Sequence, residues 1–151
     1  MEIDAELLPP QGEGRPDPAA FGRSIPPGLG INLLVRDVEA AARWQARVLG
    51  ARVIYWDRDF ALLQAQDAVW MLHHDRTYAK HPLGTAVAGE AVRGAGAELR
   101  LYGADPDRAE AAAERFGGTV LARAADKPHG VREAFLLDPE GYCWAPTKGL
   151  G

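Results

Sequence analysis

Acidic, basic and phenolic side chains alternate along one short segment of the sequence. The segment ELRLY places Glu98, Arg100 and Tyr102 at every second position. Because alternate residues of a β-strand point to the same face of its sheet, a carboxylate, a guanidinium and a phenol would share one surface. His73, near the end of the run AVWMLHH, adds a group that titrates near neutral pH. These groups could orient a ligand, or Glu98 or His73 could act as a general base on an acidic C–H bond.

A structural role for the same strand is an open alternative. Glu98 and Arg100 on one strand face can form a solvated ion pair, which contributes only about 0–1 kcal/mol. The ring of Tyr102 can instead cover the core. Cys143, the single cysteine, is interpreted as a packing residue. A reactive thiolate needs a nearby base or positive charge, and only Arg100 is an evident candidate for that charge.

The histidines do not complete a metal site. A catalytic metal typically takes about three protein ligands with nitrogen, oxygen or thiolate donors. His73 and Glu98 together supply two. His74 should face the opposite side of its strand, and His81 and His129 stand in segments with loop composition. We therefore predict no metal and no cofactor, and a metal-dependent lyase or dioxygenase with atypical ligands is the least favoured alternative.

An internal repeat predicts the elements that position these groups. Residues 30–50 align without a gap with residues 98–118, and residues 60–72 align with residues 134–146. Each copy begins with alternating apolar residues, typical of a half-buried strand, and continues with an apolar stripe at helical spacing. Two further apolar runs follow in each copy. The repeat thus predicts two units, each with the order strand, helix and three strands.

Capping residues mark the helix boundaries in both copies. Asp37 and Asp105 are good N-caps, and Pro106 suits a first helical turn. Gly50 and the pair Gly117-Gly118 are placed to end the helices. Three tryptophans are expected to pack in the core on the helix side: Trp44, Trp70 and Trp144.

The chain divides into four segments. Residues 1–28 hold six of the eleven prolines, which predicts a flexible or extended arm. Residues 29–75 and residues 97–148 are the two units, and residues 76–96 form a linker rich in alanine and glycine. The expected fold class is α+β, with two tandem βαβββ units.

A duplicated βαβββ unit that ends in DPEGYCW resembles the vicinal oxygen chelate superfamily. That superfamily includes glyoxalase I, extradiol dioxygenases, fosfomycin-resistance enzymes and bleomycin-resistance binding proteins. The segment HGVREAFLLDPEGY is most similar to the bleomycin-resistance branch. The resemblance implies a curled mixed sheet around a cleft, with the helices on the outer face, and a homodimer.

The resemblance also implies four equivalent positions for metal ligands, on the first and last strands of each unit. In this sequence they hold Gly30, Met71, Glu98 and Ala145, of which only Glu98 can bind a hard or borderline divalent ion. Ala145 stands where a metal enzyme of the family would place a carboxylate. This departure favours a member without chelate chemistry.

Strand parity counted from those four positions predicts the side chains that face the cleft. Trp56 is preferred over its neighbour Tyr55 as the aromatic residue on that face. The predicted ligand-binding residues are Asn32, Leu34, Trp56, Met71, His73, Glu98, Arg100, Tyr102, Cys143 and Ala145. Together they combine apolar walls with a few polar groups, as small-molecule pockets do.

Composition limits the classes of partner. The formal net charge of −4 gives no basic footprint for nucleic acid or an anionic membrane. No stretch approaches the roughly 20 apolar residues that span a bilayer, and the acidic start lacks the features of a secretory signal. We expect a cytoplasmic protein that binds a small molecule and neither nucleic acid nor membrane.

We expect a metal-independent small-molecule binding protein of the glyoxalase/bleomycin-resistance type, and the role considered for it is the sequestration of an antibiotic. The alternative is a metal-free isomerase or cyclase with Glu98 or His73 as general base. Burial of Glu98 among Met71, Leu34 and Ala145 would raise the pKa of its carboxyl group, whereas a nearby cation would lower it.

A homodimer is expected because unpaired edge strands invite association and two-fold symmetry is the usual solution. The arm is expected to cross onto the partner subunit, since it has little reason to fold back alone. Deletion of residues 1–24 would then weaken the dimer more than it unfolds the domain.

Overall fold

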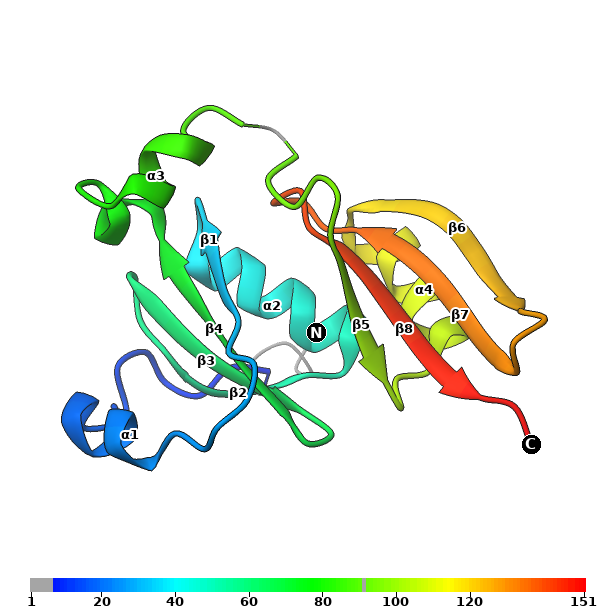
Figure 1. Ribbon diagram of the computed structural model, residues 1–151, viewed down its shortest axis with the longest axis horizontal. Helices are drawn as coiled ribbons and strands as arrows, with labels where there is room; N and C mark the ends of the chain where they lie inside the picture. The colour runs from blue at the N-terminus through cyan, green and yellow to red at the C-terminus, as the bar shows by residue number, and fades with distance from the viewer. Residues whose placement is uncertain (1–6, 91) are drawn as a thin grey trace.

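The computed structural model describes residues 7–90 and 92–151, and the first six residues of the predicted arm lie outside the described part. Both predicted βαβββ units are present (Figure 1). The first unit comprises β1 (Asn32–Val35), α2 (Val38–Leu49), β2 (Arg52–Trp56), β3 (Phe60–Ala65) and β4 (Ala68–His74). The second comprises β5 (Glu98–Tyr102), α4 (Pro106–Phe116), β6 (Thr119–Asp126), β7 (Val131–Leu137) and β8 (Cys143–Gly149).

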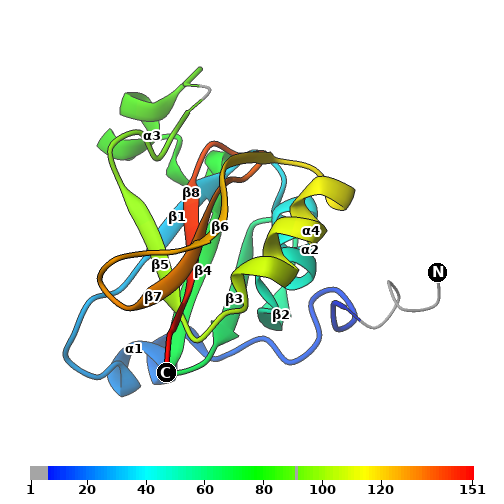
Figure 2. The same cartoon turned by 90° about the vertical axis from the view of Figure 1, so that its right-hand side faces the viewer.

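The two units form two four-stranded mixed sheets with the same topology. The strand orders are β1-β4-β3-β2 and β5-β8-β7-β6, and the sheets are not closed into a barrel. In each sheet the first and last strands run parallel and the other pairs run antiparallel. Helices α2 and α4 contact each other and lie together on one side of the sheets (Figure 2). The α+β prediction is therefore confirmed.

The predicted caps form the helix ends. The side chain of Asp37 accepts the N–H of Ala40, and Gly50 ends α2 in the left-handed conformation with φ of 72°. Asp105 accepts two N–H groups at the start of α4, and Pro106 occupies the first turn. None of the helices in residues 7–90 and 92–151 has the length and apolar character to cross a bilayer.

A single apolar core lies between the two helices and the two sheets. Trp44, Trp70 and Trp144 are all buried in it, as predicted. The rings of Trp70 and Trp144 come from the two different units, and their centroids are 5.5 Å apart. The units therefore share one core and are not two independent domains.

The second block of the internal repeat is not gapless. Leu63 pairs with Trp70 and Leu136 pairs with Trp144, and both leucines are buried in the core. The gapless alignment instead matches Leu136 with Leu62, which faces the other side of its sheet. Side-chain direction alternates with every residue, so a single-residue slip exchanges the two faces of a strand. The connection from Leu136 to Trp144 is thus one residue longer than the connection from Leu63 to Trp70.

The turn DPEG, residues 138–141, joins the two units. Asp138 is buried and accepts the N–H groups of Glu140, at 2.9 Å, and Tyr142, at 2.9 Å, together with the indole N–H of Trp144, at 2.9 Å. Burial raises the pKa of the Asp138 carboxyl group, and these three donors oppose that shift. The turn is consequently rigid and presents the side chain of Glu140 to the first unit.

Glu140 accepts backbone donors that follow β1. Its carboxylate receives the N–H of Arg36 at 2.9 Å and the N–H of Asp37 at 3.2 Å. The repeat has a weaker counterpart, in which the amide of Gln66 donates to the carbonyl of Gly103 at 3.3 Å. Each unit therefore reaches with its β-turn into the loop after the first strand of the other.

The linker between the two units is bound to the first unit. It contains a 3₁₀ turn, η2 (Asp75–Tyr78), and a short helix, α3 (Pro82–Val87). Arg93, whose side chain is almost fully buried, forms an ion pair with Asp75 and donates to the carbonyl of Leu34 at 3.2 Å. These bonds hold the linker against the first unit and restrict its movement.

The arm folds back onto the first unit, contrary to the expectation that it has little reason to do so. Leu8 is buried in the shared core. The indole N–H of Trp56 donates to the carbonyl of Pro9 at 2.6 Å, and the N–H of Gly12 donates to the carbonyl of Trp56 at 2.9 Å. The arm also contains a helix, α1 (Pro18–Ser24), in a segment where proline content predicted none.

Replacement of Glu140 should test the contact between the units. Glu140→Ala removes the acceptor of two backbone N–H groups at a buried position, so we expect a loss of about 2–3 kcal/mol of unfolding free energy. Gln66→Asn removes the exposed counterpart and suits the left-handed backbone at this residue, so its effect should stay within about 0.5 kcal/mol. Urea titration measures both, and equal losses would contradict the assigned role of Glu140.

Candidate functional site

A cavity of about 380 Å³ lies on the face of the first sheet that points away from α2. Cross-strand pairs form its floor: Leu62 pairs with Met71, and Phe60 pairs with His73. The arm forms its outer wall. The lining residues are Arg15, Pro16, Pro18, Phe21, Asp59, Phe60, Leu62, Met71, His73 and Thr77.

A row of aromatic rings crosses this face of the first unit. The ring centroids of Tyr55 and Phe60 are 6.0 Å apart, and those of Phe60 and His73 are 5.2 Å apart. The row continues to Tyr78, at 5.4 Å from His73, and to His81, at 4.6 Å from Tyr78. The tilted rings offer π-faces and edges to a flat ligand, whose stacking contributes roughly 0.5–1.5 kcal/mol beyond area burial.

His73 is the titratable group on the floor of the cavity. Burial lowers the pKa of its imidazole, because the apolar surroundings disfavour the charged form. No residue in the described part of the chain forms a hydrogen bond with the ring. His73 is therefore a neutral imidazole with one donor and one acceptor nitrogen available to a ligand.

Charged groups gather where the arm meets the turn between β2 and β3. Arg15 lies 4.0 Å from Asp57, whose carboxylate also accepts the hydroxyl of Tyr55 at 2.6 Å. Burial alone would raise the pKa of Asp57, but the Tyr55 hydroxyl and the N–H groups of Asp59 and Phe60 hold it below its ordinary value. Asp57 is thus an ionised residue that organises the turn.

The structure brings part of the predicted site together. Met71 and His73 line the cavity as expected. Asn32 pairs with Met71 across the strands, and its amide lies 3.4 Å from the hydroxyl of Tyr78 at the rim. Leu34 is buried beneath the linker, and its carbonyl accepts bonds from Tyr142 and Arg93.

Trp56 lies on the opposite side from the one predicted. It is buried in the core on the helix side, and Tyr55 instead joins the ring row beside the cavity. The pairing of β2 with β3 shifts between Val53 and Tyr55, a bulge that reverses the parity of the following residues. A count of alternating positions along a regular strand cannot detect such a bulge.

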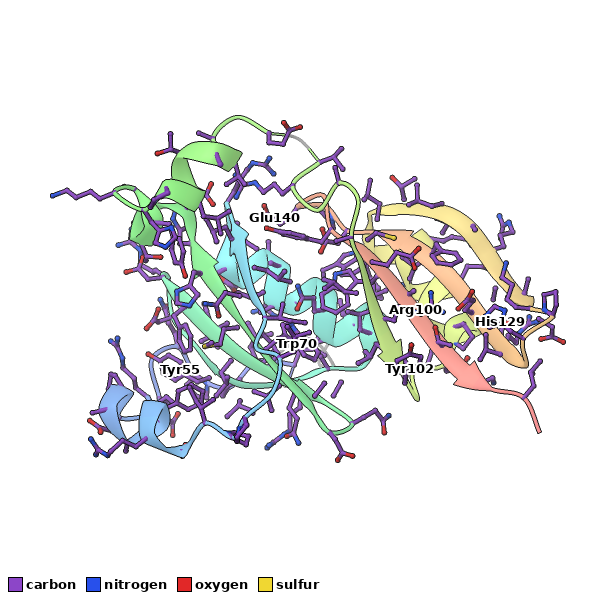
Figure 3. All side chains as sticks on the ribbon, viewed as in Figure 1. Tyr55, Trp70, Arg100, Tyr102, His129 and Glu140 are labelled. Atoms are coloured by element: carbon purple, nitrogen blue, oxygen red, sulfur yellow. The ribbon has the colours of Figure 1, made fainter. Side chains whose placement is uncertain are left out.

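The remaining predicted residues lie on the second sheet, outside the cavity. Figure 3 shows Arg100 and Tyr102 on the second unit, well away from Tyr55. Arg100 donates to Glu98 at 2.9 Å and forms an ion pair with Glu133, whose side chain is only 4% exposed. Thr147 donates to Glu133 at 3.4 Å. The cavity therefore lies on the first sheet alone, whereas the predicted cleft spans both sheets.

The expected burial of Glu98 is wrong. Its side chain is 48% exposed and bonded to Arg100, so the apolar ring of Leu34, Met71 and Ala145 does not form around it. Tyr102 is 65% exposed and does not cover the core. Glu98 and Arg100 match the alternative interpretation, an ion pair at the surface of a sheet, whereas Tyr102 matches neither interpretation.

Cys143 and Ala145 line the same face of β8. Burial raises the pKa of the Cys143 thiol, and the charge of Glu98 adds to the shift, so the thiol is protonated at neutral pH. Ala145 is fully buried. Both residues have the properties of packing positions.

The residues at the four equivalent ligand positions do not fit a metal. The register confirms the equivalence, since Asn32 pairs with Met71 as Arg100 pairs with Ala145. Of the four positions, only Glu98 offers an oxygen donor. Within residues 7–90 and 92–151, no group of three histidine, cysteine, aspartate or glutamate side chains is arranged to bind an ion. We derive no chemistry through a metal at this position.

Sequence reasoning missed most of the cavity wall. Phe60 and Leu62 pair with His73 and Met71 across the short turn between β3 and β4, and parity carried across that turn would have found them. The arm residues carried no signal, because proline-rich composition does not indicate where an extended segment docks. The missed lining residues of the arm are Arg15, Pro16, Pro18 and Phe21.

Comparison with known families identifies the fold. The model of the glyoxalase-like domain matches residues 30–144. The chain belongs to this family. It is thereby a member of the vicinal oxygen chelate superfamily, as the resemblance implied. No curated protein matches the sequence.

Solved structures of the glyoxalase-like fold align with most of the chain. A glyoxalase/bleomycin resistance protein/dioxygenase family enzyme from Burkholderia phytofirmans PsJN has a TM-score of 0.65 and 20% identity, covering 80% of this chain and 96% of that one. TioX from Micromonospora sp. ML1 has a TM-score of 0.58 and 22% identity, with coverage of 83% and 98%. The fosfomycin resistance protein FosX from Mesorhizobium loti has a TM-score of 0.57 and 17% identity, with coverage of 83% and 93%. At these identities the likeness concerns the fold.

Stability should depend on pH through His73. Its pKa is lowered in the folded protein, so as the pH falls through about 6.5 the unfolded chain takes up a proton before the folded chain does. The stability linked to this group is complete above that range and is lost below it. Between about pH 7.5 and pH 5.5, wild type should lose more unfolding free energy than His73→Phe. The control His129→Gln, in the exposed loop after β6, should lose the same unfolding free energy as wild type. If His73→Phe also loses as much as wild type, the pH dependence does not come from His73.

Proposed function

We propose that this protein is a metal-independent small-molecule binding protein and that its ligand is a flat, largely aromatic compound. The cavity over the first sheet carries the proposal. It combines apolar walls with the few polar groups of Arg15, Asp59, His73 and Thr77, which is the usual composition of a ligand pocket.

The size of the cavity limits the ligand. A volume of about 380 Å³ lies near the lower end of the range for drug-sized sites, roughly 300–1,000 Å³. A fused-ring compound can be enclosed, whereas a glycopeptide can insert only one of its groups. Sequestration of a polycyclic aromatic antibiotic is the biological role that we propose. FosX from Mesorhizobium loti, a fosfomycin resistance protein of the same fold, supports a role in antibiotic resistance.

A blocking substitution should separate binding in the cavity from binding elsewhere. Met71→Trp places a large ring on the cavity floor and should abolish binding of any polycyclic aromatic antibiotic that wild type binds. Val69→Trp adds the same ring on the same face of β4, outside the lining residues, and should bind as wild type does. Titration calorimetry measures both. The proposal fails if no compound of the panel binds wild type below roughly millimolar, about −4 kcal/mol.

A metal-free enzyme is the second candidate, and His73 favours it. Its neutral imidazole has no hydrogen-bond partner in the described part of the chain and faces the cavity, as a general base requires. Glu98 is exposed, ion-paired and outside the cavity, so it is not supported in this role. A ligand found by titration can be incubated with a small molar fraction of protein and analysed by NMR. Recovery of unchanged ligand would eliminate catalysis on that compound.

We also propose that the protein is a homodimer. Each sheet ends in two strands that pair with one neighbouring strand only, β1 and β2 in the first and β5 and β6 in the second, and such edges favour association. Because Phe21 of the arm lines the cavity of its own chain, Phe21→Ala should leave the assembly unchanged. Light scattering should give about twice the chain mass of 16.3 kDa for both proteins. A mass near that of one chain at micromolar concentration would contradict the dimer.

A further inference from the structure

The arm supplies the outer wall of the cavity, and only its first part is anchored in the core. Its first part is anchored in the core by Leu8 and bonded to Trp56. Its second part, α1, has no buried residue and is capped only by its own Asp17. Between Ile25 and Gly30 every residue is exposed. Helix α1 therefore faces the first sheet across the cavity and is not packed into the core.

Two side chains of the arm face the ring row of the sheet. Phe21 is the large apolar residue of α1 and is half-buried, although the rest of the helix is exposed. It stands on the wall opposite Phe60 and His73. A flat ligand in the cavity would therefore lie between an aromatic ring of the arm and aromatic rings of the sheet.

Arg15 brings a cation to the same wall. Its side chain is 65% exposed, and its ion pair with Asp57 is long, at 4.0 Å. The two carboxylates near the mouth are already engaged. Asp57 accepts the hydroxyl of Tyr55 and two backbone N–H groups, and Asp59 is paired with Arg76. Arg15 is thus the cation that lines the cavity, and its largely exposed guanidinium can reach a ligand at the mouth.

We propose that the site takes an aromatic anion, with its ring between Phe21 and the sheet and its carboxylate or other acidic group on Arg15. This inference rests on the proposed function and specifies its ligand class. The arm is then a part of the binding site that determines specificity. The guanidinium can form charge-assisted hydrogen bonds that a neutral analogue of the ligand cannot replace.

Naphthoate, naphthamide and naphthylmethylamine are suitable probes, because they share one ring system and differ in charge. Wild type should bind naphthoate roughly five- to tenfold more tightly than naphthamide, since the Arg15 contact is charge-assisted but partly exposed. Added salt should reduce this preference. Arg15→Gln should bind the two with equal affinity. Arg23→Gln, which removes a positive charge from the same segment outside the cavity, should keep the wild-type preference.

Phe21 provides an independent measurement. Phe21→Ala should weaken the binding of naphthoate and of naphthamide by the same factor. Ile25 is an exposed residue beyond α1, so Ile25→Ala should weaken the binding of neither probe. All four variants should retain the wild-type circular dichroism spectrum, because none of these side chains is buried in the core.

The outcomes distinguish the two proposals. Equal binding of naphthoate and naphthamide to wild type, tighter binding of naphthylmethylamine, or an unchanged preference in Arg15→Gln would overturn the aromatic-anion inference and leave the proposed function standing. The absence of binding by all three probes and by the antibiotic panel would overturn both.

Discussion

One carboxylate holds the two halves of this molecule in place. Glu140 accepts the N–H groups of Arg36 and Asp37, at the point where the chain leaves β1 and enters α2. The rigid turn around Asp138 keeps that carboxylate in position. The contact joins the backbones of the two units beside their shared core, in which Trp70 and Trp144 meet. Trp44 and Tyr142 add further bonds between the units, to the carbonyls of Gly117 and Leu34.

The duplicated framework presents two different chemical surfaces. Phe60 pairs with His73 on β3 and β4, and at the corresponding positions Glu133 pairs with Thr147 on β7 and β8. The buried carboxylate of Glu133 requires a cation, and Arg100 supplies it, so the polar groups of the second face satisfy one another. On the first face, His73 has no hydrogen-bond partner among the described residues, and a cavity lies over it. The same backbone geometry therefore yields one self-satisfied surface and one candidate site.

The sequence predicted the features that depend on local periodicity and capping. The order of strands and helices, the caps at Asp37 and Asp105, and the burial of Trp44 follow from such patterns. The bulge before Tyr55 and the longer turn at Asp138 change strand parity by one residue, and no local pattern reveals them. For that reason Trp56 was placed on the wrong face. The arm docks through a hydrogen bond that the indole N–H of Trp56 donates to the carbonyl of Pro9, 47 residues away, and composition cannot indicate such a contact.

The anchoring of the arm on Trp56 has a consequence for synthesis. The arm is synthesised before the first unit, and the indole that binds Pro9 follows 47 residues later. At elongation rates of about 5–20 residues per second, the arm exists for several seconds without its docking surface. The first sheet also needs β4, which emerges later still. The arm therefore becomes the outer wall of the cavity only after the unit beneath it, which is synthesised later, has folded.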